Sequence, residues 1–297
     1  MKRIKCLTAV IISVIILMLS VSGAFAATVY TVGGYSFNIL NNSEIGLCGW
    51  DNSTPELIVP AEIADRKLVE VSMYGLEGND GFTTLDFSQA KNLKTIGFAA
   101  FMNCVNISNE LVIPNQVKVI SVSAFENCSS IPSVTLNADV NTIQDAAFRG
   151  CTSLEKVYIK GYTQSINYQA FADCKNLSYV EIPNYVSFIS VQAFKNCPNL
   201  VLGVYKDTYA LQYAEDNKID HIILDGDKLG DVNGDGVVDI LDSTEIQKYA
   251  AERIDFTPEQ FELGDINKDG YCDVIDALLV QKSVIGAYEI PPIVVRY

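Results

Sequence analysis

The chain has 297 residues, of which 49% are apolar and 19% charged, and its formal net charge is −15. This composition excludes a disordered or collagen-like chain, and the acidic balance excludes binding to nucleic acid or an anionic membrane through basic patches. The single histidine, His221, excludes a histidine-dependent triad and a multi-histidine zinc site. An excess of carboxylates suits divalent cations instead.

Residues 1–26 have the pattern of an export signal. A basic start at 1–5 precedes an apolar run at 7–21 and the sequence Ala-Phe-Ala at 24–26, which has the form of a cleavage site. The alternative is an uncleaved anchor, but the run is shorter than the roughly 20 residues that span a bilayer. We expect a mature protein that begins near Ala27, is secreted, and has no later membrane span.

The middle of the chain contains a repeat with a period of about 23 residues. Each copy has an isoleucine five residues before an Ala-Phe phenylalanine, and a cysteine three residues after it. An earlier, degenerate copy without the cysteine begins at Val71. The five full copies centre on Phe101, Phe125, Phe148, Phe171 and Phe194, with cysteines Cys104, Cys128, Cys151, Cys174 and Cys197.

This periodicity predicts a solenoid, because one unit cannot bury its apolar residues alone whereas stacked units align them into continuous columns. Alternating strands at 133–136, 156–159 and 179–182 should direct their valines, isoleucines and leucine inward. The outward positions are then Thr135, Lys156, Tyr158, Tyr179 and Glu181. Five equivalent cysteines cannot pair off, so we expect free, buried thiols rather than disulfides.

The repeats resemble the BspA-like leucine-rich repeats of bacterial surface proteins over about residues 30–222, for example in the strand Leu111-Val112-Ile113-Pro114. This resemblance implies a mixed α/β solenoid of short strands stacked into sheets. Residues 30–60 should cap its start, and a helix within 205–224, with Ala210, Tyr213 and Ala214 on one side, should cap its end.

Two segments near the C-terminus, 231–242 and 265–276, have the spacing of a calcium-binding loop. Oxygen-bearing side chains stand at loop positions 1, 3, 5, 9 and 12, and glycine at position 6 allows the sharp turn. We therefore expect two Ca²⁺ ions. The expected ligands are Asp231, Asn233, Asp235, Asp239 and Asp242 with the Val237 carbonyl, and Asp265, Asn267, Asp269, Asp273 and Asp276 with the Tyr271 carbonyl.

Each loop runs into an apolar helical pattern, at 240–254 and 274–285, and no such pattern precedes the first loop, which disfavours an EF-hand pair. Thr257 and Pro258 indicate the start of a short helix between the copies. The Leu-Gly-Asp-x-Asn-x-Asp-Gly start, the aspartate at position 12 and the tandem copy resemble a type I dockerin over residues 230–286. That implies a small all-α calcium-binding module.

The dockerin resemblance implies binding to a cohesin module of a scaffoldin through loop positions 10, 11, 17 and 18. The alternative for the aliphatic members is packing in the core. Since the set recurs at an offset of 34, a pseudo-two-fold axis would present equivalent surfaces in two orientations. The residues are Ile240, Leu241, Gln247 and Lys248 in the first copy, and Val274, Ile275, Gln281 and Lys282 in the second.

The expected organisation is a signal peptide at 1–26, a capped solenoid at 27–224, a linker at 225–229 and a dockerin with a C-terminal tail at 230–297. The leading hypothesis is a secreted, non-catalytic binding or structural subunit of a cellulosome-type complex at the cell surface, with no catalytic residues. The repeats would present a protein- or glycan-binding surface, for which Tyr158 and Tyr179 are candidates; the alternative for this pair is packing between rungs. The alternative functions are a polysaccharide-degrading enzyme and a cell-surface adhesin.

Overall fold

The computed structural model describes residues 28–297, and the expected signal peptide at 1–26 lies outside them. The chain divides into two compact units, one ending at Leu200 and the other running from Val201 to Tyr297. Within the described residues, no helix is both long and apolar enough to cross a bilayer.

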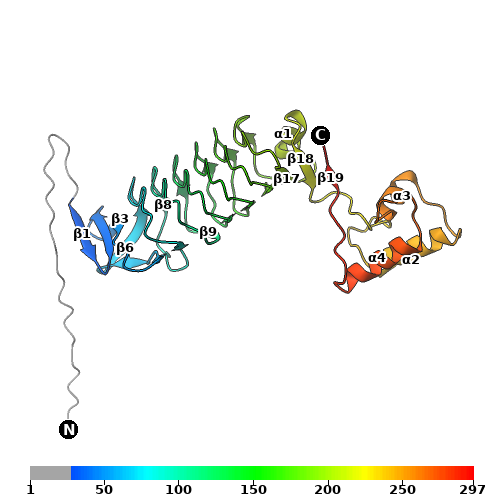
Figure 1. Cartoon of the computed structure of the whole chain (residues 1–297), viewed down its shortest axis with the longest axis horizontal. Helices are drawn as coiled ribbons and strands as arrows, with labels where there is room; N and C mark the ends of the chain where they lie inside the picture. The colour runs from blue at the N-terminus through cyan, green and yellow to red at the C-terminus, as the bar shows by residue number, and fades with distance from the viewer. Residues whose placement is uncertain (1–27) are drawn as a thin grey trace, which may run out of the picture. The chain divides into compact units, whose positions relative to one another are not determined.

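The first unit begins with an antiparallel meander, β1–β2–β3, whose last strand pairs in parallel with β6 and so starts the stacked strands (Figure 1). The short strand β5 pairs antiparallel with β6. This meander lies beside the first repeat strand, almost entirely within the segment 30–60 that was predicted to be a cap. The bounds are β1 Val29–Val32, β2 Tyr35–Ile39, β3 Glu44–Trp50, β4 Glu56–Ile58, β5 Glu62–Ile63 and β6 Arg66–Val71.

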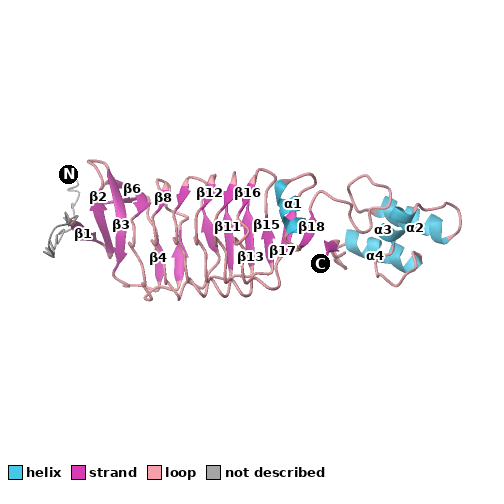
Figure 2. Ribbon diagram, turned by 90° about the horizontal axis from the view of Figure 1, so that it is seen from above, coloured by secondary structure: helices cyan, strands magenta, loops and turns pink. Residues whose placement is uncertain are grey.

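The repeats contribute strands to parallel ladders, which run side by side along the first unit in Figure 2. One ladder has the order β6-β8-β10-β12-β14-β16, another β9-β11-β13-β15, and β4 pairs with β7. The expected fold is therefore confirmed as a solenoid of short stacked strands. The bounds are β7 Thr84–Asp86, β8 Thr95–Ile96, β9 Leu111–Ile113, β10 Val119–Ile120, β11 Ser133–Leu136, β12 Thr142–Ile143, β13 Lys156–Ile159, β14 Ser165–Ile166, β15 Tyr179–Glu181 and β16 Phe188–Ile189.

Columns of identical side chains fill the core of the first unit. The repeat isoleucines are directly paired in register, and Ile120, Ile143 and Ile166 are fully buried. The phenylalanine rings stack almost parallel, with centroids 5.1 to 5.6 Å apart from Phe101 to Phe194. This arrangement gives each rung an apolar partner on both sides.

The repeat cysteines are free thiols, as predicted, and the first four are buried. Each also donates a hydrogen bond to a backbone carbonyl of the preceding rung, which the sequence did not predict. Cys151 Sγ, for example, lies 3.2 Å from Phe125 O, and Cys174 Sγ lies 3.2 Å from Phe148 O. Burial raises the pKa of the Cys104 thiol to about 12 and raises that of Cys151 well above its ordinary value.

One strand position that was predicted to face outward is buried. Thr135 is 9% exposed, because the neighbouring strands place Val112 and Tyr158 directly beside it. Its hydroxyl donates to Glu110 Oε1 at 3.0 Å, which satisfies the buried oxygen.

The second unit starts with β17 (Val201–Val204), parallel to β18 (Asp220–Ile223). Between them lies the expected cap helix α1 (Tyr209–Asp216), with Thr208 as its N-cap. Its buried residues are the three that the sequence predicts, Ala210, Tyr213 and Ala214.

A three-helix module follows, with α2 (Ile240–Ala250), α3 (Pro258–Gly264) and α4 (Val274–Val284). Helix α3 has the predicted Thr257 N-cap and Pro258 start. Helix α2 ends four residues before the predicted 254, because Glu252 adopts a left-handed conformation with φ 56°. The small core of the module consists of Leu229, Val232, Ile246, Ile266, Cys272, Ala277 and Val280.

Candidate metal loops and partner-binding surface

Each predicted loop is closed around the aspartate at its first position. In the first loop, Asp231 Oδ1 accepts hydrogen bonds from the N–H groups of Gly234 and Asp235, and Oδ2 accepts from Gly236 N–H. Gly236 has φ 85°, the conformation expected at the sharp turn. The local sequence therefore folds the chain back over a single carboxylate.

The second loop repeats this arrangement 34 residues later. Asp265 Oδ1 accepts from Asp269 N–H and Oδ2 from Gly270 N–H, and Gly270 has φ 88°. Position 4 differs, because Lys268 stands there with φ 59° where the first loop has Gly234.

The aspartate at position 12 joins the two ends of each loop. Asp242 Oδ1 accepts from the N–H groups of Val232 and Asn233, and Oδ2 accepts from Asp239 N–H. Asp242 is fully buried, and this burial raises the pKa of its carboxyl, with a further increase from the nearby charge of Asp231. Asp276 is equally buried and makes the corresponding bonds in the second loop.

The position-9 aspartates serve a second purpose as helix N-caps. Asp239 Oδ1 accepts from Leu241 N–H, and Asp273 Oδ1 accepts from Ile275 N–H. With Asp242 and Asp276 at N3, each forms a reciprocal capping box. The same side chains thus close the loop and begin the helix.

The donor set of each loop fits calcium. It consists of four aspartates, an asparagine and a carbonyl, all hard oxygen ligands of the kind that Ca²⁺ binds in groups of six to eight. Among residues 28–297, no three histidine, cysteine or acidic side chains converge as they stand on a single metal position. The carboxylates are instead held by loop N–H groups, so the loops are closed but the ligands are not gathered around one point.

The predicted cohesin-binding surface has eight residues, four on α2 and four on α4. Ile240, Leu241, Val274 and Ile275 have exposed fractions between 51% and 64%. Packing in the core, the alternative considered for these aliphatic side chains, is therefore not what the structure shows. Gln247, Lys248 and Lys282 are also exposed, and Gln281 is half-buried.

Helices α2 and α4 pack against each other through residues related by the internal repeat. Ser243 Oγ donates to the carbonyl of Ala277, its counterpart in the second copy, at 3.0 Å. Gln281 Nε2 donates to Ser243 Oγ at 2.9 Å. By the internal repeat, the equivalent partner of Gln247 would be Ala277, which has no hydroxyl. The pseudo-two-fold relation is therefore broken at this contact. Ser243 was not among the predicted site residues, although its difference from Ala277 at the equivalent position of the second copy is visible in the sequence.

Tyr158 and Tyr179, the candidate surface of the repeats, do lie next to each other. Their ring centroids are 5.9 Å apart with planes at 56°, and Lys160 Nζ lies 5.6 Å from the Tyr158 ring. Both side chains are half-buried. A more exposed pair that was not predicted, Tyr162 and Tyr185, has ring centroids 5.3 Å apart.

The C-terminal tail pairs with strand β18 of the second unit. Strand β19 (Val294–Val295) pairs antiparallel with β18, and Arg296 Nη1 lies 2.8 Å from Asp220 Oδ2. The Tyr297 ring packs 5.9 Å from the His221 ring. The tail, which was predicted to belong to the helical module, therefore also covers the edge of β18.

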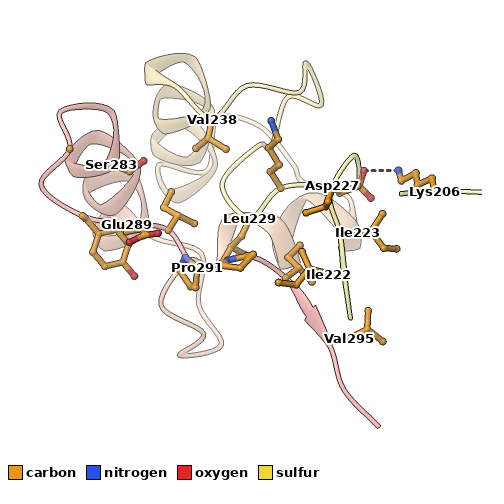
Figure 3. Close-up of a pocket in the computed structure, with 18 of the residues that line it drawn as sticks. Lys206, Ile222, Ile223, Asp227, Leu229, Val238, Ser283, Glu289, Pro291 and Val295 are labelled. Atoms are coloured by element: carbon orange, nitrogen blue, oxygen red, sulfur yellow. Dashed lines mark hydrogen bonds and ion pairs between the residues drawn. The ribbon is translucent and has the colours of Figure 1, made fainter. Parts of the chain in front are cut away.

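A pocket of about 890 Å³ lies between this tail and the segment that follows β18 (Figure 3). Its lining is mainly aliphatic and includes Ile222, Leu229, Pro291 and Val295. No local sequence pattern predicts this pocket, because it forms from segments about 70 residues apart.

Two family models match the chain. A BspA type leucine-rich repeat region matches residues 70–201 in six copies, and a type I dockerin domain matches residues 229–285. The sixth copy agrees with the degenerate repeat expected at Val71. Both kinds of region are non-catalytic modules, and type I dockerin domains bind calcium. A search of curated proteins found no match.

Solved structures of leucine-rich repeat proteins resemble the chain. One from T. pallidum has 23% identity and a TM-score of 0.53, covering 58% of this chain and 80% of that one. One from Bacteroides ovatus has 20% identity and a TM-score of 0.41, covering 59% of this chain and 55% of that one. One from Eubacterium ventriosum has 23% identity and a TM-score of 0.41, covering 55% and 44%. The first supports the solenoid fold.

Proposed function

Because the chain carries a BspA-type leucine-rich-repeat region and a type I dockerin domain, we propose that it is a non-catalytic subunit of a cellulosome-type complex. The dockerin would attach it to a cohesin module of a scaffoldin, and the repeats would present a binding surface to a protein or glycan. The observation that carries this proposal is the duplicated loop and helix. The helix of each copy carries two exposed aliphatic residues and an exposed lysine, with a glutamine that is exposed in the first copy and half-buried in the second.

Two Ca²⁺ ions are part of the proposal, one for each loop. The chain supplies the same oxygen donors in both copies, and both position-12 aspartates are buried against loop N–H groups. A bound divalent cation would offset the repulsion among the carboxylates of each loop. The ligands would be the twelve residues predicted from the loop spacing.

The proposed division of the chain is a signal peptide at 1–26, a capped solenoid at 27–224, a linker at 225–229 and the dockerin with its tail at 230–297. Both matched regions are typical of extracellular proteins, which supports secretion. Attachment to a scaffoldin would place the mature protein in a complex outside the cell.

The ligand surface of the repeats is proposed to include Tyr158 and Tyr179. Adjacent aromatic rings offer contact area at little cost in conformational entropy. The pair should be tested with a Tyr158→Ala and Tyr179→Ala double variant once a ligand of the repeats is found. Unchanged binding of every such ligand would reject this site.

An enzyme and an adhesin are the alternative functions. A glycosidase needs two carboxylates about 5–10 Å apart across a substrate cleft, and both matched regions are non-catalytic modules.

The experiment that tests the proposal is calcium-dependent binding of the mature chain to an array of type I cohesin modules, with a hydrolase screen on plant polysaccharides in parallel. Binding that EDTA abolishes, without hydrolysis, is expected. Hydrolysis would support the enzyme, and absence of cohesin binding would reject the dockerin-based attachment.

A further inference from the structure

Helices α2 and α4 each expose one stripe of side chains. The stripe consists of loop positions 10, 11, 14, 17 and 18, which fall on one face because they recur at helical spacing. Position 14 lies at the centre of the stripe. The stripe residues are Ile240, Leu241, Thr244, Gln247 and Lys248 on α2, and Val274, Ile275, Leu278, Gln281 and Lys282 on α4.

The two stripes differ in chemistry at their centre. On α2 the central residue is Thr244, whose hydroxyl donates to Ile240 O at 2.8 Å and is already satisfied. On α4 it is Leu278, an aliphatic side chain that is 46% exposed. One turn further on, Ala251 of the first copy corresponds to Ile285 of the second, which is 77% exposed. The α4 stripe is therefore apolar from Val274 to its centre at Leu278, whereas the α2 stripe has a polar group at its centre.

The glutamines of the two stripes also differ. Gln281 is half-buried and donates to Ser243 Oγ at 2.9 Å, which fixes its side chain. Gln247 is exposed, and Ala277, the counterpart of Ser243, has no hydroxyl to which it could donate. Ordering a glutamine on binding costs conformational entropy, and Gln281 has already lost that freedom.

The residues beside the two lysines differ in polarity. Lys248 Nζ lies 2.8 Å from Glu245 Oε1 on its own helix, whereas Leu279 stands at the position of Glu245 in the second copy. The α2 stripe is thus bordered by a carboxylate and the α4 stripe by another leucine. The central and bordering residues make α4 the more apolar face, and the bond to Ser243 makes its glutamine the better ordered of the two.

We propose that this dockerin binds its cohesin in one preferred orientation, with the α4 stripe as the main contact and Leu278 as its central anchor. The inference rests on the proposed function, since it names the face through which that attachment is made. The receiving surface of the cohesin would be an apolar patch, because the residues with the largest effect on affinity lie at the centre of an interface. The two orientations allowed by the internal repeat would then differ in affinity by far more than the statistical factor of about two.

The test uses the full mature chain with calcium, an immobilised panel of type I cohesin modules and calorimetry on any module that binds. Leu278→Thr should weaken binding at least tenfold. The matched control is Val284→Thr on the same helix, which is 50% exposed and lies off the stripe, and it should stay within about twofold. Adding Thr244→Leu to Leu278→Thr transfers the apolar centre to α2 and should recover most of the lost affinity, a result that misfolding would not produce.

A second comparison, of the affinity lost by two double variants, tests the orientation directly. The pair Val274→Asp and Ile275→Asp should cost at least ten times more affinity than the pair Ile240→Asp and Leu241→Asp. Equal losses from the two pairs, or a Leu278→Thr variant within twofold of wild type, would overturn this inference while the proposed function stands. Wild-type protein that binds no cohesin would overturn the proposed function instead.

Discussion

At the scale of single residues, helices α2 and α4 end in the same hydrogen-bonded turn, but different residues occupy its left-handed position. After α2, Glu252 N–H bonds to Tyr249 O and Arg253 N–H to Lys248 O. After α4, the equivalent bonds begin at Gly286, which has φ 71°. The left-handed position that usually takes glycine is therefore occupied by Glu252, with φ 56°.

We expect Glu252→Gly to stabilise the helical module by about 0.5–1 kcal/mol, because a side chain in the left-handed region is strained and glycine is not. Gly286→Glu should cost a similar amount through the backbone alone, since a Cβ there meets nothing within 4 Å. Urea unfolding in saturating calcium would measure both. Glu252→Ala is the control, because it keeps the strain; a gain equal to that of glycine would contradict the explanation.

The buried thiols predict a pH dependence of the repeats. The ordinary pKa of a thiol is 9.0, and burial raises that of Cys151 well above this value in the folded chain. Above about pH 9 the unfolded chain therefore binds fewer protons than the folded one, so stability falls as the pH rises. Each such thiol contributes about 1.4 kcal/mol per pH unit to this loss.

Cys151→Ser should remove one thiol's share of the slope while keeping a donor for Phe125 O. Urea unfolding under reducing conditions at about pH 8 and about pH 10 would measure it, with Cys151→Ala as the comparison that lacks the donor. A slope identical to wild type in both variants would show that the Cys151 thiol ionises in the folded chain.

At the scale of elements, the stacked phenylalanines should account for much of the stability of a rung. Phe148 is fully buried between Phe125 and Phe171, with centroids 5.3 and 5.4 Å away. Phe148→Ala should cost about 3–5 kcal/mol, since the neighbouring rings cannot close the cavity without moving their rungs. Denaturant unfolding measures this. The exposed Val191, truncated to alanine, should change stability by no more than about 0.5 kcal/mol, and a similarly small loss at Phe148 would contradict the packing argument.

The columns of the solenoid were predictable because side-chain identity repeats with the rung. The backbone between them was not. Phe125 N–H bonds to Ala147 O and Phe148 N–H to Ala170 O, both at 2.8 Å, so even the turns form ladders between rungs. Backbone bonds of this kind depend on the path of the chain rather than on residue type, and left-handed residues such as Ala146 and Gln169 carry no sequence signal for it.

The candidate site divides in the same way. The oxygen-bearing loop positions and the exposed helix positions follow from local spacing, which the sequence displays. The early end of α2 did not follow, because Glu252 is not a usual stop signal. The Gln281–Ser243 contact and the return of β19 to β18 join residues 38 and more than 70 positions apart, which no local pattern reports.

At the scale of the whole molecule, the two units should respond differently to calcium. The first unit has its own apolar columns, whereas the helical module has a small core and two loops with four aspartates each. Chelation should therefore unfold residues 230–286 and leave the repeats intact, because cation binding and folding are coupled. Hydrogen exchange of the full chain with and without EDTA would show it: protection should be lost in α2 and α4 and kept in β11 and β13. Unchanged protection of α2 and α4 would refute the coupling.

The number of ions can be counted by removing one loop at a time. Asp231 and Asp265 each accept bonds from N–H groups at the turn of their own loop, so Asp231→Ala and Asp265→Ala should each abolish one calcium site. Calorimetric titration of the calcium-free chain should give two ions for wild type, one for either variant and none for the double variant. The remaining site should also weaken, because α2 and α4 pack together and each helix starts at its own loop, so a disordered loop removes its neighbour's support. A single ion in the wild-type chain, or two in either variant, would show that the duplicated loops are not both calcium sites.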